Sequence, residues 1–124
     1  MTQDQIERCD ALWRELMDAG NVWWVEGMAT RHEWRAVLAI ANRCLAVQHS
    51  GGMAVWRTAD DCLPDWEDPA TIGCLVAMAR EATGDAEASC VVYGGLWHCD
   101  WHGNETIAET EPEALLRAIK EAAR

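Results

Sequence analysis

Apolar residues recur every three or four positions near the start of the chain, which is the spacing of an amphipathic helix. The residues that share this face are Ile6, Cys9, Trp13 and Leu16. Thr2 and Gln5 have the spacing of a capping box, and Gly20 supplies a stop signal. We therefore predict one helix over about residues 3–19.

The pattern then becomes typical of β-strands, although the many alanines in this part of the chain also allow one long helix. Three valines favour a sheet, namely Val37, Val47 and Val55. The pair Gly51-Gly52 favours a hairpin. We predict three strands, with turns at Ala41-Asn42 and Ser50-Gly51-Gly52, at roughly residues 34–40, 43–49 and 53–57.

Two further helices are predicted from their first turns. Asp68 has the position of an N-cap, Pro69 follows at the first helical position, and Gly84 ends the pattern. Thr110 and Glu113 form a second capping-box pattern, which opens a C-terminal helix. The residues expected on the buried side of that last helix are Leu115, Leu116 and Ile119.

Between these two helices the chain reads as a hairpin. The segments "ASCVVYG" and "LWHCDWH" are joined at Gly94-Gly95, and "ETIAET" adds a short edge strand. The order helix, strands, helix, strands, helix predicts an α+β fold, in which three helices flank a small antiparallel sheet. With 124 residues, we expect a single domain over residues 1–124.

Composition favours a cytosolic protein. No apolar stretch reaches the length of a membrane span, and the charged N-terminus lacks the apolar core of a signal peptide. The six cysteines lie inside apolar patterns, so we expect reduced and mostly buried thiols. There is no CxxC pair that would suggest a zinc knuckle.

The charge is unevenly distributed. The chain has a formal net charge of −11, and residues 58–116 carry thirteen acidic residues against one base, Arg80. Direct binding to a nucleic-acid backbone needs the opposite sign, so that class of function is disfavoured. Such acidity serves solubility, and it also suits a face that meets a basic partner protein.

The segment "HCDWH" gathers two histidines, a cysteine and an aspartate. On a strand, His98, Asp100 and His102 share one face, while Trp97, Cys99 and Trp101 share the other. His98 and His102 then lie about 13 Å apart, too far to share one ion on a straight strand. A third ligand would have to come from His32 or His49, so we expect an amphipathic strand and no metal site.

Other catalytic patterns are absent from the sequence. The acidic residues of 60–68 lack the spacing of a calcium loop, and there is no P-loop, GxSxG or GxGxxG motif. Six thiols and four histidines leave a Cys–His nucleophilic pair open, yet no spacing singles one out. We expect no catalytic residue and no cofactor.

Two segments carry a resemblance. "LPDWEDPATIGCLVAMAREATGD" and the C-terminal "TEPEALLRAIKEAA" resemble small phage and prophage proteins of unknown function. Those proteins have a PDxxDPATxG segment that opens a helix and a final TExEAL helix, and the arrangement is similar to phage helix–sheet sandwich domains. The resemblance covers about residues 52–123. It implies a phage accessory protein expressed in the bacterial cytoplasm, and it supplies no catalytic residues.

Three functional hypotheses follow. The first is a non-catalytic, anti-CRISPR-like inhibitor of a host defence protein that has a basic surface. Its acidic face would comprise Asp60, Asp61, Asp65, Glu67, Asp68 and Asp100, and its aromatic anchors would be Trp23, Trp24 and Trp66. The second is a sponge for a cyclic nucleotide signal, at a dimer interface, held by Arg31, Arg35, Arg43 and Arg57. The third is a metal-dependent enzyme built on the histidine strand.

Overall fold

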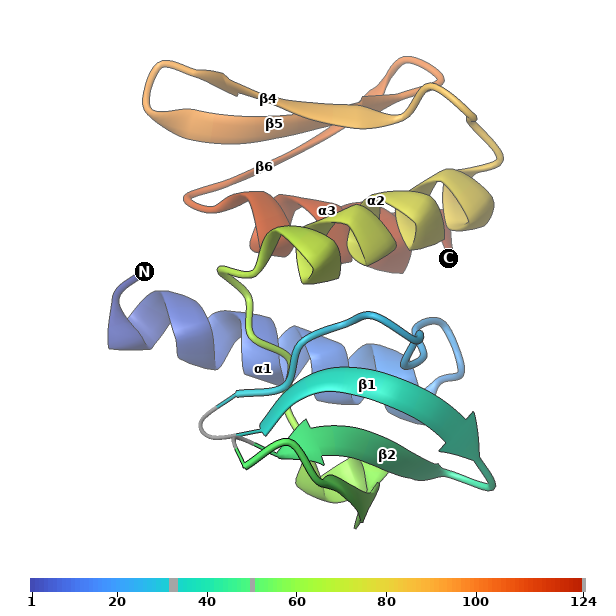
Figure 1. Ribbon diagram of the computed structural model, residues 1–124. Coiled ribbons are helices and arrows are strands. Elements are labelled where there is room, and N and C mark those ends of the chain that lie inside the picture. The colour runs from blue at the N-terminus through green and yellow to red at the C-terminus, as the bar shows by residue number, and fades with distance from the viewer. Residues whose placement is uncertain (32–33, 50, 124) are drawn as a thin grey trace. The chain divides into compact units, whose positions relative to one another are not determined.

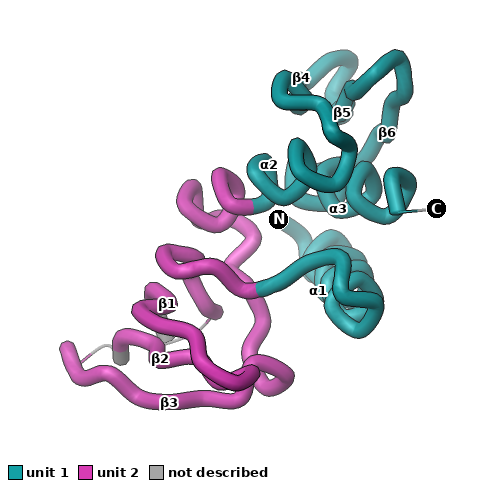
Figure 2. The backbone as a smooth tube through the Cα atoms, turned by 90° about the vertical axis from the view of Figure 1, so that its right-hand side faces the viewer, with its two compact units in different colours: residues 1–23, 75–124 teal, residues 24–74 magenta. Residues whose placement is uncertain are grey.

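The computed structural model describes residues 1–31, 34–49 and 51–123, and at residues 34, 35 and 49 it describes the backbone alone. Within these residues the chain forms three α-helices and two antiparallel three-stranded sheets (Figure 1). The predicted α+β class is confirmed, with two small sheets in place of the single one expected. The chain divides into two compact units, unit 1 (residues 1–23 and 75–124) and unit 2 (residues 24–74), which Figure 2 colours separately. Whether they form one domain, as predicted, stays a prediction.

Unit 1 opens with helix α1, Gln3–Asp18, which begins at the predicted capping box. The backbone N–H of Gln5 donates to Thr2 Oγ1 at 3.2 Å, and the backbone N–H of Thr2 donates to Gln5 Oε1 at 2.9 Å. These two bonds satisfy backbone donors that the first turn of a helix leaves unpaired.

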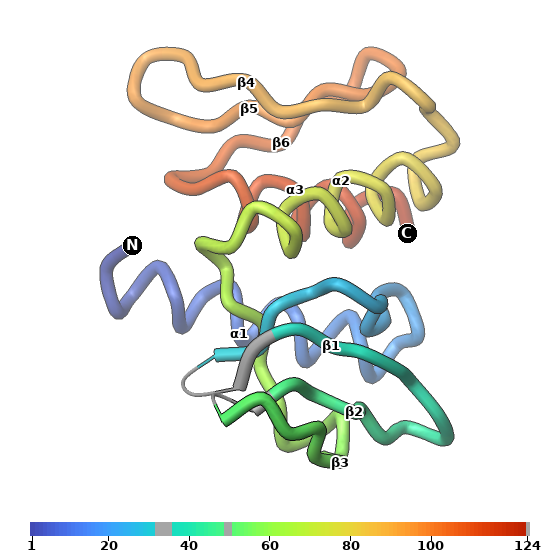
Figure 3. The backbone as a smooth tube through the Cα atoms, viewed as in Figure 1, coloured from blue at the N-terminus to red at the C-terminus, as the bar shows by residue number. Residues whose placement is uncertain are grey.

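The sheet of unit 1 has the strand order β4-β5-β6. Its strands are β4 (Ser89–Tyr93), β5 (Leu96–Trp101) and β6 (Asn104–Ala108), and helix α3 (Glu111–Ala122) follows. Helix α3 contacts all three strands on one side and α1 on another (Figures 1 and 3). The predicted hairpin, the edge strand and the final helix are thereby confirmed.

The core of unit 1 lies where α1, α3 and the sheet meet. Fully buried side chains come from each of these elements, including Trp13, Cys99, Leu115, Leu116 and Ile119. Burying side chains of this size contributes about 1.5–3 kcal/mol each, so this layer supplies much of the unit's stability.

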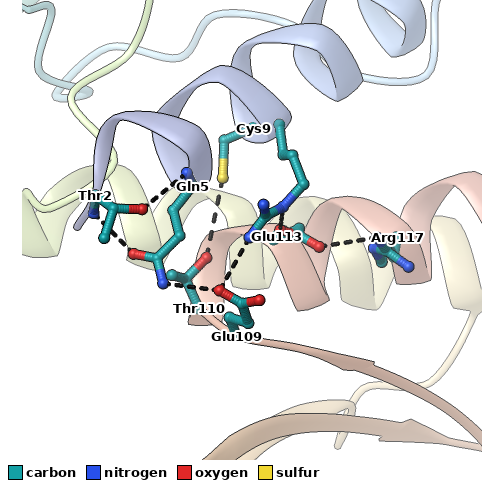
Figure 4. A network of polar contacts seen from close by, with 8 residues as sticks. Thr2, Gln5, Cys9, Glu109, Thr110, Glu113 and Arg117 are labelled. Carbon is teal, nitrogen blue, oxygen red and sulfur yellow. Dashed lines mark hydrogen bonds and ion pairs between the residues drawn. The ribbon is translucent and has the colours of Figure 1, made fainter.

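The second predicted capping box does not form. Thr110 is the N-cap of α3, but its side chain makes no capping hydrogen bond. Glu113 turns instead to two arginines, Arg8 Nε and Arg117 Nη2, each at 2.9 Å (Figure 4). A charge-assisted ion pair with two guanidinium groups outweighs a single bond to the helix's own backbone.

Unit 2 contains the sheet β1-β2-β3, so the three strands are confirmed against the long helix. The strands are β1 (Trp34–Ala41), β2 (Cys44–His49) and β3 (Ala54–Thr58). The first turn lies one residue later than predicted, at Asn42 and Arg43, whose φ angles are 49° and 64°. This left-handed pair is what a two-residue hairpin turn requires, even without glycine.

Helix α2, Pro69–Thr83, begins in unit 2 and ends in unit 1. Its N-cap is Asp68, as predicted, because Asp68 Oδ2 accepts the backbone N–H of Thr71 at 3.0 Å. The hydroxyl oxygen of the buried Thr71 accepts the backbone N–H of Ala29 at 3.0 Å. The 3-10 turn η1, Ala59–Asp61, precedes this region.

Candidate functional site

Strand β5 has the two faces that its sequence predicts. Cys99 and Trp101 are buried, whereas Asp100 is exposed. The buried face looks toward α3, because Thr106 lies opposite Cys99 and its hydroxyl donates to the backbone O of Ala114 at 2.9 Å. The opposite side, here called the outer face, therefore points away from α3.

The strand register defines which residues share the outer face. Three rows of cross-strand neighbours contribute to it. Its members are Ser89, Val91, Tyr93, Leu96, His98, Asp100, Glu105 and Ile107. Among the hydrophobic ones, Tyr93 is 75% and Val91 is 53% exposed, and Leu96 and Ile107 are exposed as well. Apolar surface thus adjoins carboxylates on one sheet face.

His102 is not part of this face, and that prediction is wrong. β5 ends at Trp101, and His102 occupies the following turn with a φ of 43°. Its backbone N–H donates to Asp85 Oδ2 at 3.1 Å, and its Nδ1 lies 3.8 Å from the same oxygen. Hydrogen bonds from the backbone of Glu87 and of His102 lower the pKa of Asp85.

His98 is held in place by its neighbours on the outer face. Its Nδ1 lies 3.3 Å from Glu105 Oε2, and its Nε2 lies 3.2 Å from the backbone O of Tyr93. The Tyr93 ring meets the imidazole edge-on, with centroids 5.7 Å apart and planes at 74°. Among the described residues, no three potential ligands gather as a metal site. His32 and the side chain of His49 lie outside those residues.

Two carboxylates face each other on the outer face. Asp100 is the direct cross-strand neighbour of Glu105. Loss of water contact, together with a hydrogen bond and charge repulsion from Glu105, raises the pKa of Asp100, while His98 partly offsets this. Like charges directly opposite each other destabilise a sheet, so this arrangement has an electrostatic cost.

The predicted acidic residues of 60–68 all belong to unit 2, whereas Asp100 belongs to unit 1. Asp60 and Asp61 are exposed in η1. Asp68 caps α2, and Asp65 Oδ1 accepts the backbone N–H of the exposed Glu67 at 3.1 Å. Asp65 and Asp68 therefore help to shape the chain locally, and whether the segment binds a partner stays a prediction.

Of the three predicted aromatic anchors, only Trp23 reaches the surface, with 43% of it exposed. Trp24 and Trp66 are 5% and 3% exposed and belong to the core, so we drop them as anchors. Two more exposed aromatic residues are Trp56 on β3 and Tyr93 on β4. The alternation of residues along each strand separates its two faces, but it does not show which face packs against the core and which stays exposed.

The predicted ligand-binding arginines have separate environments. Arg31 donates through Nε and Nη2 to the backbone O of Pro64, at 3.4 and 3.2 Å. Arg43 sits in a turn, Arg57 is exposed on β3, and the side chain of Arg35 lies outside the described residues. The described contacts do not bring these arginines together around a site.

A groove of about 430 Å³ in unit 1 is lined by three other cations. Each already has an acidic partner. Arg8 pairs with Glu109 at 3.0 Å and with Glu113, Arg117 also pairs with Glu113, and Lys120 pairs with Glu15 at 3.0 Å (Figure 4 shows the arginine pairs). The groove therefore offers balanced charge rather than a free anion-binding site.

The six cysteines are all free thiols. Burial raises the pKa of Cys9 to about 12, although a contact with Thr110 opposes the shift. Cys90 lies opposite Cys99 in the sheet, and a hydrogen bond to that thiol together with burial raises the pKa of Cys90. Burial also raises the pKa of Cys62 and Cys74. These four thiols are poor nucleophiles near neutral pH.

Comparison of the chain with protein-family models, with curated proteins and with solved structures found no match. The resemblance to phage proteins therefore stays a prediction. In the part of the chain that the structure describes, no helix is both long and apolar enough to cross a membrane.

Proposed function

We propose that this protein is a non-catalytic binding protein whose outer face receives basic side chains of a partner protein. The observation that carries the proposal is the pair of facing carboxylates, Asp100 and Glu105. Loss of water contact, followed by a hydrogen bond and charge repulsion from Glu105, raises the pKa of Asp100, and the repulsion is a cost to the isolated chain. A lysine or arginine of the partner placed between the two carboxylates neutralises their repulsion. Relief of this repulsion makes the binding free energy more favourable.

The apolar part of the outer face supports the same function. Val91 and Ile107 are exposed in the row next to the carboxylates, and Tyr93 and Leu96 are exposed in the row beyond it. Protein interfaces combine an apolar, aromatic centre with a polar and charged rim, and tyrosine is among the residues enriched in binding hot spots. Tyr93 would be an aromatic anchor at the hairpin end of this face, because its ring is exposed and is oriented by His98.

The class of partner follows from charge and from the resemblance given above. A net charge of −11 favours a basic partner over a nucleic acid. If the chain is a phage accessory protein acting in the bacterial cytoplasm, the partner is a host defence protein, and covering its basic surface would inhibit it. Asp60 and Asp61 in unit 2 are a second candidate contact for the same partner.

The test is a comparison of tagged variants used to capture proteins from a bacterial host lysate. The double variant Asp100→Asn/Glu105→Gln keeps the shape of both side chains and removes their charge. We expect it to lose a basic, stoichiometric partner that the wild-type chain retains, while its thermal stability does not fall.

The matched control is Asp60→Asn/Asp61→Asn, which removes two exposed charges from unit 2. Loss of the partner only in this control would move the interface to η1. Retention of the partner by both double variants, or loss in the first caused by unfolding, would count against the outer face.

A further inference from the structure

The two sheets have four edge strands, and three of them carry features that discourage pairing with another strand. Edge strands are commonly protected by charged residues, prolines or bulges. β1 has irregular register with β2, β3 contains Arg57, and β6 contains Glu105. β4 has the sequence SCVVY, which contains no charge and no proline, and its register with β5 is continuous.

The backbone of β4 has groups directed away from β5. The turn Gly94-Gly95 has φ angles of 60° and 79°, so the hairpin closes on the hydrogen-bonded pair Tyr93 and Leu96. Because pairing alternates along an antiparallel ladder, Cys90 and Val92 direct their N–H and C=O groups to the free edge. Outside the helices and strands, no described backbone hydrogen bond involves residues 89–93.

The side chains along this edge are apolar and accessible. Val91, Val92 and Tyr93 are each more than half exposed. An uncharged, regular edge strand with exposed apolar side chains is a template for another strand.

We propose that β4 pairs antiparallel with β4 of a second copy of this chain, about a two-fold axis at Val91. In this register Cys90 faces Val92 of the second copy, so the edge-directed donors and acceptors match in both directions. Val91 faces Val91, and Ser89 faces Tyr93. The two sheets become one six-stranded sheet with a continuous outer face.

The uncharged, regular edge of β4 matches itself about a two-fold axis, so the occupant that it fits is a second copy. Two chains of net charge −11 repel each other, so their contact needs a surface where no carboxylates oppose. The β4 register brings no charged pair together. The edge strand β6, by contrast, carries the charged Glu105. A basic strand from another protein would find no opposite charge on β4 to favour it.

The first test is the mass of the full chain in solution by sedimentation equilibrium. The chain has a mass of 13.8 kDa, and we expect twice that value at high concentration. Val92→Pro removes an edge-directed N–H without breaking the bonds to β5, and Val91→Lys places two ammonium groups at the axis. Both should be monomers, whereas Ile107→Lys, an apolar-to-lysine change on β6 of the same face, should remain a dimer.

The second test does not depend on those variants folding well. Val91→Cys puts two thiols opposite each other at the axis, at a separation suited to a disulfide. Mild oxidation should link this variant into a covalent dimer faster than Ser89→Cys, whose thiol faces Tyr93. A monomeric wild-type chain, a dimer that survives both β4 changes, or equal cross-linking of the two cysteine variants would each overturn the proposal.

Discussion

At the scale of single residues, Glu113 shows how one carboxylate joins two helices. Its side chain is only 3% exposed, and it bonds to Arg8 of α1 and to Arg117 of α3 (Figure 4). Glu113→Gln removes the charge while both guanidinium groups remain, so we expect a loss of about 1–3 kcal/mol in unfolding free energy. Urea denaturation measures this loss.

The control for that prediction is Glu109, which also pairs with Arg8 but is 57% exposed. Water screens an exposed ion pair, so Glu109→Gln should lower the unfolding free energy much less than Glu113→Gln does. If both substitutions lower the unfolding free energy equally, the burial of Glu113 is not the reason for its contribution to stability.

Asp100 provides a test of the outer face that needs no partner. Its pKa in the folded protein lies above the unfolded value. The folded chain therefore binds this proton more tightly, and the wild-type protein loses stability as pH rises through that pKa. The Asp100→Asn variant has no carboxylate at this position and avoids the loss. Its melting temperature should therefore exceed that of the wild-type protein by more at about pH 7 than at about pH 4. An advantage equal at both pH values would mean that charge repulsion is not its source.

At the scale of elements, the turn between β1 and β2 contains removable strain. Asn42 and Arg43 both have positive φ angles, which cost a residue with a Cβ more than they cost glycine. We expect Arg43→Gly to raise the unfolding free energy by about 0.5–1 kcal/mol, because glycine suits the second position of this turn. The control is Arg57→Gly, the same change inside β3, which should lower stability. Chemical denaturation measures the unfolding free energy of both variants.

The same turn shows which parts of the fold could be predicted from sequence. Helix α1, the start of α2 and all six strands follow from local periodicity, caps and glycine pairs, which depend on neighbouring residues. The Asn42–Arg43 turn and the end of β5 before His102 were misplaced by one residue, because both turns place a non-glycine residue in the left-handed region.

Long-range pairing set the limit of prediction for the fold and for the candidate site. The capping box at Thr110 fails because Glu113 finds Arg8, 105 positions away in sequence. Alternation correctly placed Asp100 on the exposed side of β5, but it could not show that Glu105 lies opposite. Nor could it show that six strands form two sheets, since alternation identifies a strand's faces and not its neighbours.

At the scale of the whole molecule, the two proposed contacts respond in opposite ways to salt. A net charge of −11 attracts a basic partner to the outer face and repels a second copy at β4. Raising the ionic strength screens both forces. Partner binding should weaken by on the order of tenfold between about 0.05 and 0.5 M salt, whereas the β4 dimer should become tighter.

Titration calorimetry with the captured partner and sedimentation of the chain alone, over the same salt series, measure the two responses separately. The Asp100→Asn/Glu105→Gln variant sharpens the comparison, since it removes two negative charges from each copy. It should dimerise more tightly than the wild-type chain at low salt and match it at high salt. If salt weakens both contacts alike, the dimer is held by charge pairs, and the uncharged edge of β4 is not the surface that joins the two copies.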